Sequence, residues 1–290
     1  MTVMGNVKIL AKPQLRDPVA IISFAGWANA GEVATSSVSY LKDIFKASPL
    51  ARIEPDPYYD FTSRRPKGLV KEGRVAGFYM PRNQFSFCQP EEGRGTILFR
   101  GDEPHLCWNS FIRDMLTVLE KFGVSLVVTV GGTYDERLHT DPPRISVIAE
   151  EMVLAEGLLS RGAILAEYNG PVSIHTALYV ACREKGFNVV SLWAHAPVYV
   201  QTGNFSLVRE VMELIAALGG PNPNLEPLDE AQLKMDRQIE ALIKRSSKLA
   251  DYIEGLKGGS AVGTEEVDEL SRSTAKIIPL NRPKNHNQED

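Results

Sequence analysis

Four runs of apolar residues, separated by stretches with helical spacing, constrain the fold of this chain most strongly. The runs are VAIISFA (residues 19–25), TILFRG (96–101), SLVVTVGG (125–132) and FNVVSLWA (187–194). Continuous apolar residues are typical of parallel strands that are covered on both faces. Helical patterns occur at residues 32–45, 108–122 and 171–186. The alternation predicts an α/β fold, with helices on both faces of one sheet.

Two regions depart from this alternation. Residues 52–95 mix polar and apolar residues with frequent proline and glycine, which predicts antiparallel strands inserted into an α/β core domain of residues 1–225. A connector, PNPNLEPLDEA, then leads to an apolar stripe that predicts one long helix at residues 229–255, within a C-terminal helical segment of residues 226–256. Residues 257–290 are polar, and we expect them to form a flexible tail.

Composition excludes some classes of protein. The net charge of −4 over 290 residues gives no general attraction to nucleic acid or to acidic membranes. The N-terminus lacks the apolar region of a signal peptide, and no stretch approaches the roughly 18 apolar residues of a membrane span. Three widely separated cysteines indicate neither a disulfide framework nor a metal site. We therefore expect a cytoplasmic protein that binds neither nucleic acid nor membrane.

The turn after the first apolar run, FAGWANAGEV, resembles a phosphate-binding P-loop. A P-loop needs a lysine and then a serine or threonine after its second glycine, and this chain has Glu32 and Val33 there. The Glu32 carboxylate would repel a phosphate. Gly26 and Gly31 are better explained by a tight turn and close packing of helix against strand.

Polar residues follow each of the four runs. The carboxyl ends of parallel strands meet at one edge of a sheet, where ligands commonly bind. The candidate pocket residues at this edge are Trp27, Asn29, Asp102, Glu103, Asp135, His139 and His195. They could carry out acid–base chemistry, or they could cap helix ends. No serine-hydrolase Gly-x-Ser-x-Gly and no His-Glu-x-x-His is present, so we assign no catalytic residue and expect no metal and no cofactor.

Six separated motifs resemble those of the proteasome assembly chaperone 2 family, in the branch found in bacteria and especially in actinobacteria. In chain order they are GWANAGEVATSS, YYDFTSRRP, GDEPHLCW, GGTYDERLHTDPP, YNGPVSIHTAL and SLWAHAPVYV. The resemblance covers roughly residues 18–256 and is carried by the order and spacing of the motifs together.

This resemblance implies a three-layer α/β/α sandwich with a phosphorylase/hydrolase-like mixed sheet, and a homo-oligomer, for which we expect a trimer. Relatives in eukaryotes and archaea are non-enzymatic chaperones of proteasome assembly. The sequence departs from the pattern of this family at two places. Ala28 and Asn29 stand where bacterial members often have Asn-Asp, and the chain ends Gln288-Glu289-Asp290. Archaeal relatives that dock on the proteasome end in a hydrophobic–Tyr–any tripeptide, so docking by that route is not expected here.

The sequence leaves two hypotheses for function. The first is a non-enzymatic, homo-oligomeric interaction or assembly protein, with contacts made by the 52–95 insertion or by the 229–255 helix. The second is a small-molecule-binding protein or a hydrolase- or phosphorylase-like enzyme that uses the pocket at the strand ends.

Overall fold

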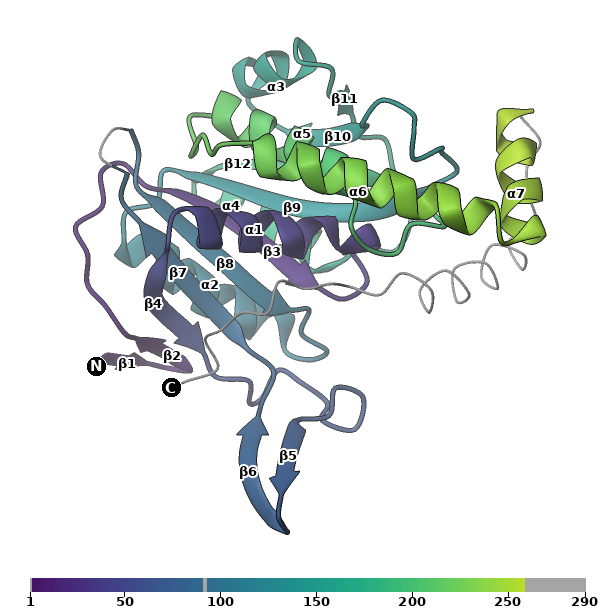
Figure 1. Ribbon diagram of the computed structural model, residues 1–290. Coiled ribbons are helices and arrows are strands. Elements are labelled where there is room, and N and C mark those ends of the chain that lie inside the picture. Colours follow the sequence, from purple (N-terminus) through teal and green to yellow (C-terminus); the bar gives the residue numbers. More distant parts are fainter. Residues whose placement is uncertain (1, 91–92, 259–290) are drawn as a thin grey trace.

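The computed structural model describes residues 2–90 and 93–258 of the chain. Its main sheet contains ten strands: β1 (Thr2–Met4), β2 (Val7–Ile9), β3 (Val19–Ala25), β4 (Ser48–Ile53), β7 (Asn83–Cys88), β8 (Thr96–Asp102), β9 (Leu126–Asp135), β10 (Ile145–Ala149), β11 (Ile164–Leu165) and β12 (Asn188–Pro197). The helices are η1 (Ala30–Glu32), α1 (Val33–Ile44), α2 (Trp108–Lys121), α3 (Met152–Leu159), α4 (Ile174–Glu184), α5 (Phe205–Ala217), α6 (Glu226–Ile243) and α7 (Ser247–Lys257). Figure 1 shows their arrangement.

The four apolar runs form the centre of the main sheet, as predicted. The strand order is β1-β2-β4-β7-β8-β3-β9-β12-β10-β11, so β8, β3, β9 and β12 are neighbours. These four strands are parallel to one another, whereas β2, β4 and β7 continue the sheet in antiparallel pairs. The sheet is therefore mixed, and the turns that follow the four parallel strands all lie at one edge.

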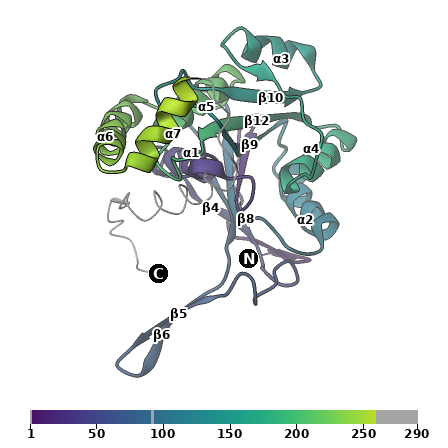
Figure 2. The same ribbon diagram turned by 90° about the vertical axis from the view of Figure 1, so that its right-hand side faces the viewer.

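Helices cover both faces of the sheet, which confirms the three-layer α/β/α sandwich (Figure 2). One apolar cluster joins the sheet to α1, α3 and α5, through side chains such as Val38, Leu158 and Val211. A second cluster joins the opposite face to α2 and α4, through side chains such as Phe111 and Leu178. Alternate residues of a strand point to opposite faces, so each parallel strand contributes to both clusters.

The glycine-rich turn after β3 is a packing device, as the sequence predicted. Gly31 has a φ of 60°, and a Cβ there would lie 2.2 Å from Nδ2 of Asn204. A Cβ on Gly132 of β9 would lie 2.7 Å from the carbonyl oxygen of Ala30. Glycine is needed at both positions, because the turn lies directly against Asn204 at Gly31 and against β9 at Gly132.

The inserted region divides into two parts. Strand β7 joins the main sheet between β4 and β8. Strands β5 (Lys67–Lys71) and β6 (Arg74–Tyr79) form a separate two-stranded antiparallel sheet. This hairpin projects away from the body of the molecule in both views (Figures 1 and 2). We call residues 67–79 the arm.

The C-terminal segment differs from the single long helix that the apolar stripe predicted. Helix α6 ends at Ile243, and Ser246 begins α7 by accepting a hydrogen bond from the backbone N–H of Leu249. That N-terminal cap accounts for the break, because a serine side chain stabilises a new helix start there. Helices α6 and α7 pack on Tyr199 and Val200, which follow β12. Residues 259–290 lie outside the described residues, so the flexible tail remains a prediction.

The segment β10-α3-β11 was not assigned any element from the sequence. Strand β10 pairs antiparallel with β12, and β11 pairs parallel with β10 at the end of the sheet. Among the described residues, no helix combines the length and the apolar character needed to cross a membrane.

Candidate functional site

The residues predicted at the sheet edge fall into separate groups of contacts. Glu103, after β8, accepts hydrogen bonds from two backbone N–H groups, that of Ile174 at 2.9 Å and that of Trp27 at 3.3 Å. Ile174 is the first residue of α4, where the helix dipole favours a carboxylate. Glu103 therefore ties the turn after β3 to the start of α4. The Trp27 side chain itself is 64 % exposed.

Asn29 and Asp102 have structural partners. The Asn29 side chain accepts a hydrogen bond from the backbone N–H of Thr35 at 3.1 Å and donates one to the Thr35 hydroxyl at 3.0 Å, which fixes the first turn of α1. The Asp102 carboxylate forms an ion pair of 2.6 Å with Arg64. Asn29 matches the alternative that polar residues at strand ends cap helices, whereas Asp102 forms an ion pair with a side chain of the inserted region.

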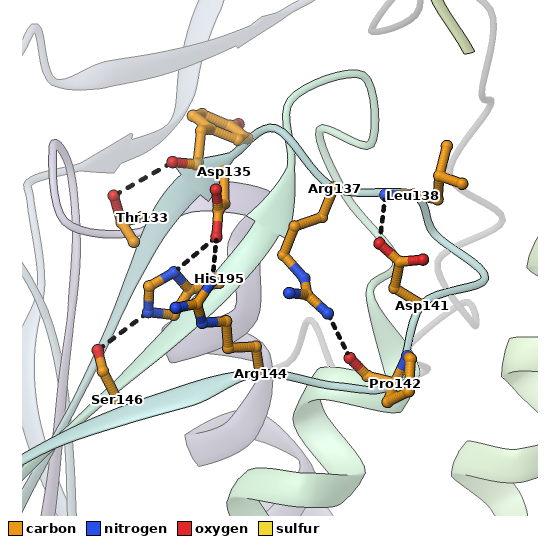
Figure 3. A network of polar contacts seen from close by, with 10 residues as sticks. Thr133, Asp135, Arg137, Leu138, Asp141, Pro142, Arg144, Ser146 and His195 are labelled. Carbon is orange, nitrogen blue, oxygen red and sulfur yellow. Dashed lines mark hydrogen bonds and ion pairs between the residues drawn. The ribbon is translucent and has the colours of Figure 1, made fainter. Parts of the chain in front are cut away.

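Asp135, His195 and Ser146 form a continuous chain of hydrogen bonds across three strands (Figure 3). Nδ1 of His195 lies 3.0 Å from a carboxylate oxygen of Asp135, and Nε2 lies 3.0 Å from the hydroxyl oxygen of Ser146. The register explains the contact. Thr133 is paired with His195, so Asp135 is a diagonal neighbour on one side, and Ser146 is the diagonal neighbour on the other.

The partners of His195 determine its protonation. A carboxylate can only accept, so Nδ1 carries the proton that is donated to Asp135, and Nε2 accepts from the Ser146 hydroxyl. Burial lowers the pKa of His195, and the Arg144 guanidinium adds to this effect, while the hydrogen bond to Asp135 opposes it. Arg144 also lies 3.6 Å from the Asp135 carboxylate. His195 is therefore neutral at pH 7.

The order carboxylate, imidazole, hydroxyl is that of a serine-hydrolase triad. Ser146, however, is 6 % exposed and lies inside a regular strand rather than at a sharp turn. A substrate carbonyl could not approach its hydroxyl oxygen without displacement of β10 or its neighbours. Ser146 was not among the residues predicted at the sheet edge. The alternation of apolar and polar residues in RISVIA was the available signal for β10.

His139 belongs to a second contact. The hydroxyl oxygen of Tyr199 accepts from the backbone N–H of His139 at 2.7 Å and lies 2.7 Å from its Nδ1. Since the Tyr199 hydroxyl proton is free to point at Nδ1, that nitrogen is the acceptor. Burial lowers the pKa of His139, and the carboxylates of Asp236, Glu240 and Asp141 oppose this shift.

His139 and His195 line the same cavity. It lies between the loop of residues 137–144, the start of α5 and helix α6, and its volume is about 20 Å³. A cavity of this size holds about one water molecule, whereas sites for drug-sized ligands measure roughly 300–1,000 Å³. Within residues 2–90 and 93–258, no group of three or more His, Cys, Asp or Glu side chains is placed to hold a metal ion.

The structure thus brings some predicted residues together and separates others. Trp27 contacts Glu103, Asp135 contacts His195, and His139 shares a cavity with His195. No hydrogen bond or ion pair between described residues joins the Glu103 group to the His195 group.

A further histidine lies beneath the edge, in the first turn of α4. The His175 ring is fully buried, with its centroid 5.2 Å from that of Phe24 and 5.6 Å from that of Trp193. Neither of its ring nitrogens has a hydrogen-bond partner among the residues that the structure describes. Burial alone lowers the pKa of His175 to about 3.

Comparison with solved structures identifies relatives of this chain. It is 29 % identical to a PAC2 family protein from Streptomyces avermitilis, with a TM-score of 0.71, over 82 % of this chain and 100 % of that chain. It is 28 % identical to the proteasome-assembly chaperone homologue Rv2125 from Mycobacterium tuberculosis, with a TM-score of 0.71, over 81 % and 99 % of the two chains. The Pyrococcus furiosus archaeal proteasome activator PbaB shares the fold, with 18 % identity and a TM-score of 0.66, over 81 % of this chain and 97 % of that chain.

A search of curated proteins found no match. The model of the PAC2 family matches residues 23–243, which include the central strands, both helical layers and the arm. This match spans far more than half of the sequence. The chain belongs to the PAC2 family.

Proposed function

We propose that this protein is a non-enzymatic, homo-oligomeric interaction or assembly protein of the kind that proteasome-assembly chaperones represent. The observation that carries the proposal is the family match over residues 23–243. The similarity to a mycobacterial proteasome-assembly chaperone homologue over 99 % of that chain supports it. A trimer is the assembly that we propose.

Exposed apolar side chains give this proposal a physical basis. Val75 and Phe78 on the arm are 74 % and 66 % exposed. Apolar side chains that stay in contact with water add no hydrophobic stabilisation to the fold. Clusters of such side chains on a protein surface mark sites of contact with other proteins. The small volume of the cavity beside His139 and His195 also favours protein contacts over small-molecule binding.

Light scattering of the purified chain, combined with quantitative affinity capture from its own cells, tests the proposal. We expect a molar mass that is a multiple of 32.0 kDa and at least one protein that is captured reproducibly above background. A mass of 32.0 kDa at every concentration, with no protein enriched, would count against it.

The Asp135–His195–Ser146 chain of hydrogen bonds supports a second candidate, a hydrolase. In that case the neutral His195 would take the Ser146 proton while the hydroxyl oxygen attacks a carbonyl, and Asp135 would stabilise the resulting imidazolium. We rank this candidate second because the Ser146 hydroxyl is buried in a strand.

A serine-reactive fluorophosphonate distinguishes the two candidates. The hydrolase predicts labelling of the native protein that is lost in Ser146→Ala and in His195→Ala. The assembly protein predicts no labelling above that of Ser146→Ala. A thermal-shift screen of metabolites is the second arm, because a ligand at one hundred times its Kd adds about 2.7 kcal/mol to the free energy of unfolding. Loss of any shift in His139→Ala or Glu103→Gln would place the ligand at the sheet edge.

A further inference from the structure

The arm carries an apolar surface that the other described residues of its chain leave exposed. Its five large apolar side chains are all more than a third exposed, and they are Leu69, Val70, Val75, Phe78 and Tyr79. None of the three apolar clusters formed by the described residues includes a residue of the arm. An isolated two-stranded hairpin is marginally stable in water. The described part of the chain supplies neither a third strand nor a packed helix to stabilise the arm.

Phe78 is the largest apolar side chain of the arm that is more than half exposed. It is paired across the two strands with Gly68, and the space where a Cβ of Gly68 would lie is open. Tyr79, by contrast, lies over Gly77, where a Cβ would be 2.7 Å from the tyrosine hydroxyl oxygen. One face of the arm thus has a tyrosine ring packed on its own backbone, and Phe78 projects beside an empty position. Such a side chain suits insertion into a partner surface.

Helix α3 and strand β11 lie at the end of the molecule opposite the arm, and they carry a second group of exposed apolar side chains (Figure 1). It is formed by α3, β11 and the loop before α4, and we call residues 149–172 the edge patch. Its large apolar side chains are Met152, Val153, Ile164, Leu165, Tyr168 and Val172, with exposed fractions from 36 % to 80 %. Strand β11 is the last strand of the sheet, and within residues 2–90 and 93–258 no strand pairs with its outer edge.

The two surfaces carry opposite charge. The arm, residues 67–79, contains three basic residues and one acidic residue, a net +2 in a chain of net −4. Residues 149–172 contain four acidic residues and one basic residue, a net −3. Lys67, Lys71 and Arg74 on the arm have no ion-pair partner among the described residues, and neither do Glu151 and Glu167 on the edge patch. Opposite charge around two apolar surfaces steers them together and sets their register.

We propose that the arm of one copy of this chain docks on the edge patch of a second copy. The inference rests on the proposed homo-oligomer and identifies the two surfaces that form its contact. The arm cannot reach the edge patch of its own chain, since the two lie at opposite ends of the fold (Figures 1 and 2). Each copy carries one arm and one edge patch, so the contact is head-to-tail, and a closed ring is the assembly in which every arm and every edge patch is occupied.

Two variants remove one side of the contact each. Val75→Asp with Phe78→Asp places charges on the arm, and Val153→Asp with Leu165→Asp places charges on the edge patch. All four side chains lie outside the apolar clusters, so both variants should fold, which circular dichroism checks. Leu233→Asp is the matched control, because Leu233 is an exposed apolar residue on α6, 59 % accessible, outside both surfaces.

Light scattering on each variant and on their mixture tests the proposal. We expect Leu233→Asp to keep the mass of the wild type and both double variants to run as monomers of 32.0 kDa. An equimolar mixture should give a dimer, because one copy supplies the intact edge patch and the other the intact arm. Reversal of charge gives a second readout. Lys67→Glu should weaken assembly, and Glu167→Lys in the same chain should restore it.

Other outcomes overturn the inference. If the wild type is oligomeric and either double variant keeps its mass, the copies associate through other surfaces. If both double variants are monomers and their mixture also stays monomeric, the arm and the edge patch do not bind one another. In both cases the proposed homo-oligomer stands. A wild type that is monomeric would overturn both.

Discussion

The buried imidazole of His175 predicts how the stability of this protein changes with pH. Its ring nitrogens have no hydrogen-bond partner in the described part of the chain, and burial lowers its pKa from 6.5 to about 3. Between these values the unfolded chain binds a proton at this residue and the folded chain does not. The free energy of unfolding therefore falls as pH falls below about 6.5, and this loss continues down to the folded pKa near 3.

The magnitude follows from the two pKa values. Each pH unit within this window lowers the free energy of unfolding by about 1.36 kcal/mol. Between pH 7 and pH 5 only the part below 6.5 counts, so the titration of His175 lowers the free energy of unfolding by about 2 kcal/mol. His175→Phe is the matched variant, because it keeps a ring between Phe24 and Trp193 and cannot titrate. The difference between wild type and variant cancels the contributions of His139 and His195, which titrate in both.

Urea titration at a fixed protein concentration, at pH 7, 6 and 5, measures this difference. We expect the wild type to lose about 2 kcal/mol more than His175→Phe between pH 7 and pH 5. Equal losses in the two proteins would refute the reasoning, because they would mean that the folded chain hydrates or pairs the His175 ring.

Three further predictions concern residues that hold the sheet edge together, and urea titration measures each. Asn29→Ala removes the hydrogen bonds to Thr35 and should cost about 1 kcal/mol; a change near zero would mean that solvent caps α1 equally well. Gly132→Ala should cost about 1–3 kcal/mol, because its Cβ would meet the backbone of Ala30, whereas Gly157→Ala on the open face of α3 should add about 0.5–1 kcal/mol. Glu103→Gln should cost about 1 kcal/mol by removing charge from the start of α4, and an unchanged stability would contradict that role.

The central sheet was predictable because each parallel strand corresponds to one continuous run of apolar residues in the sequence. Strands β8, β3, β9 and β12 lie side by side, as the alternation of these runs with helical patterns predicts. The close fit of Gly31 against Asn204 could be predicted only as a tight turn, since Asn204 is distant in sequence.

The rest depended on contacts that sequence periodicity does not carry. Ser146 reaches His195 only because β10 runs antiparallel to β12 at the end of the sheet, a pairing with no local signal. The insertion was predicted to be antiparallel, but nothing in its alternation separated β7, which joins the sheet, from the arm. The break before α7 depended on one serine cap within a continuous apolar stripe.

Hydrogen–deuterium exchange, compared between the assembled wild type and the two double variants, tests the central claim, contact between arm and edge patch, most directly. Charges on the edge patch (Val153→Asp with Leu165→Asp) should speed exchange in residues 67–79, and charges on the arm (Val75→Asp with Phe78→Asp) should speed exchange in residues 149–172. Because the two segments lie at opposite ends of one chain, each effect would have to pass between copies. Exchange in each segment that is unchanged by substitution in the other would contradict the account.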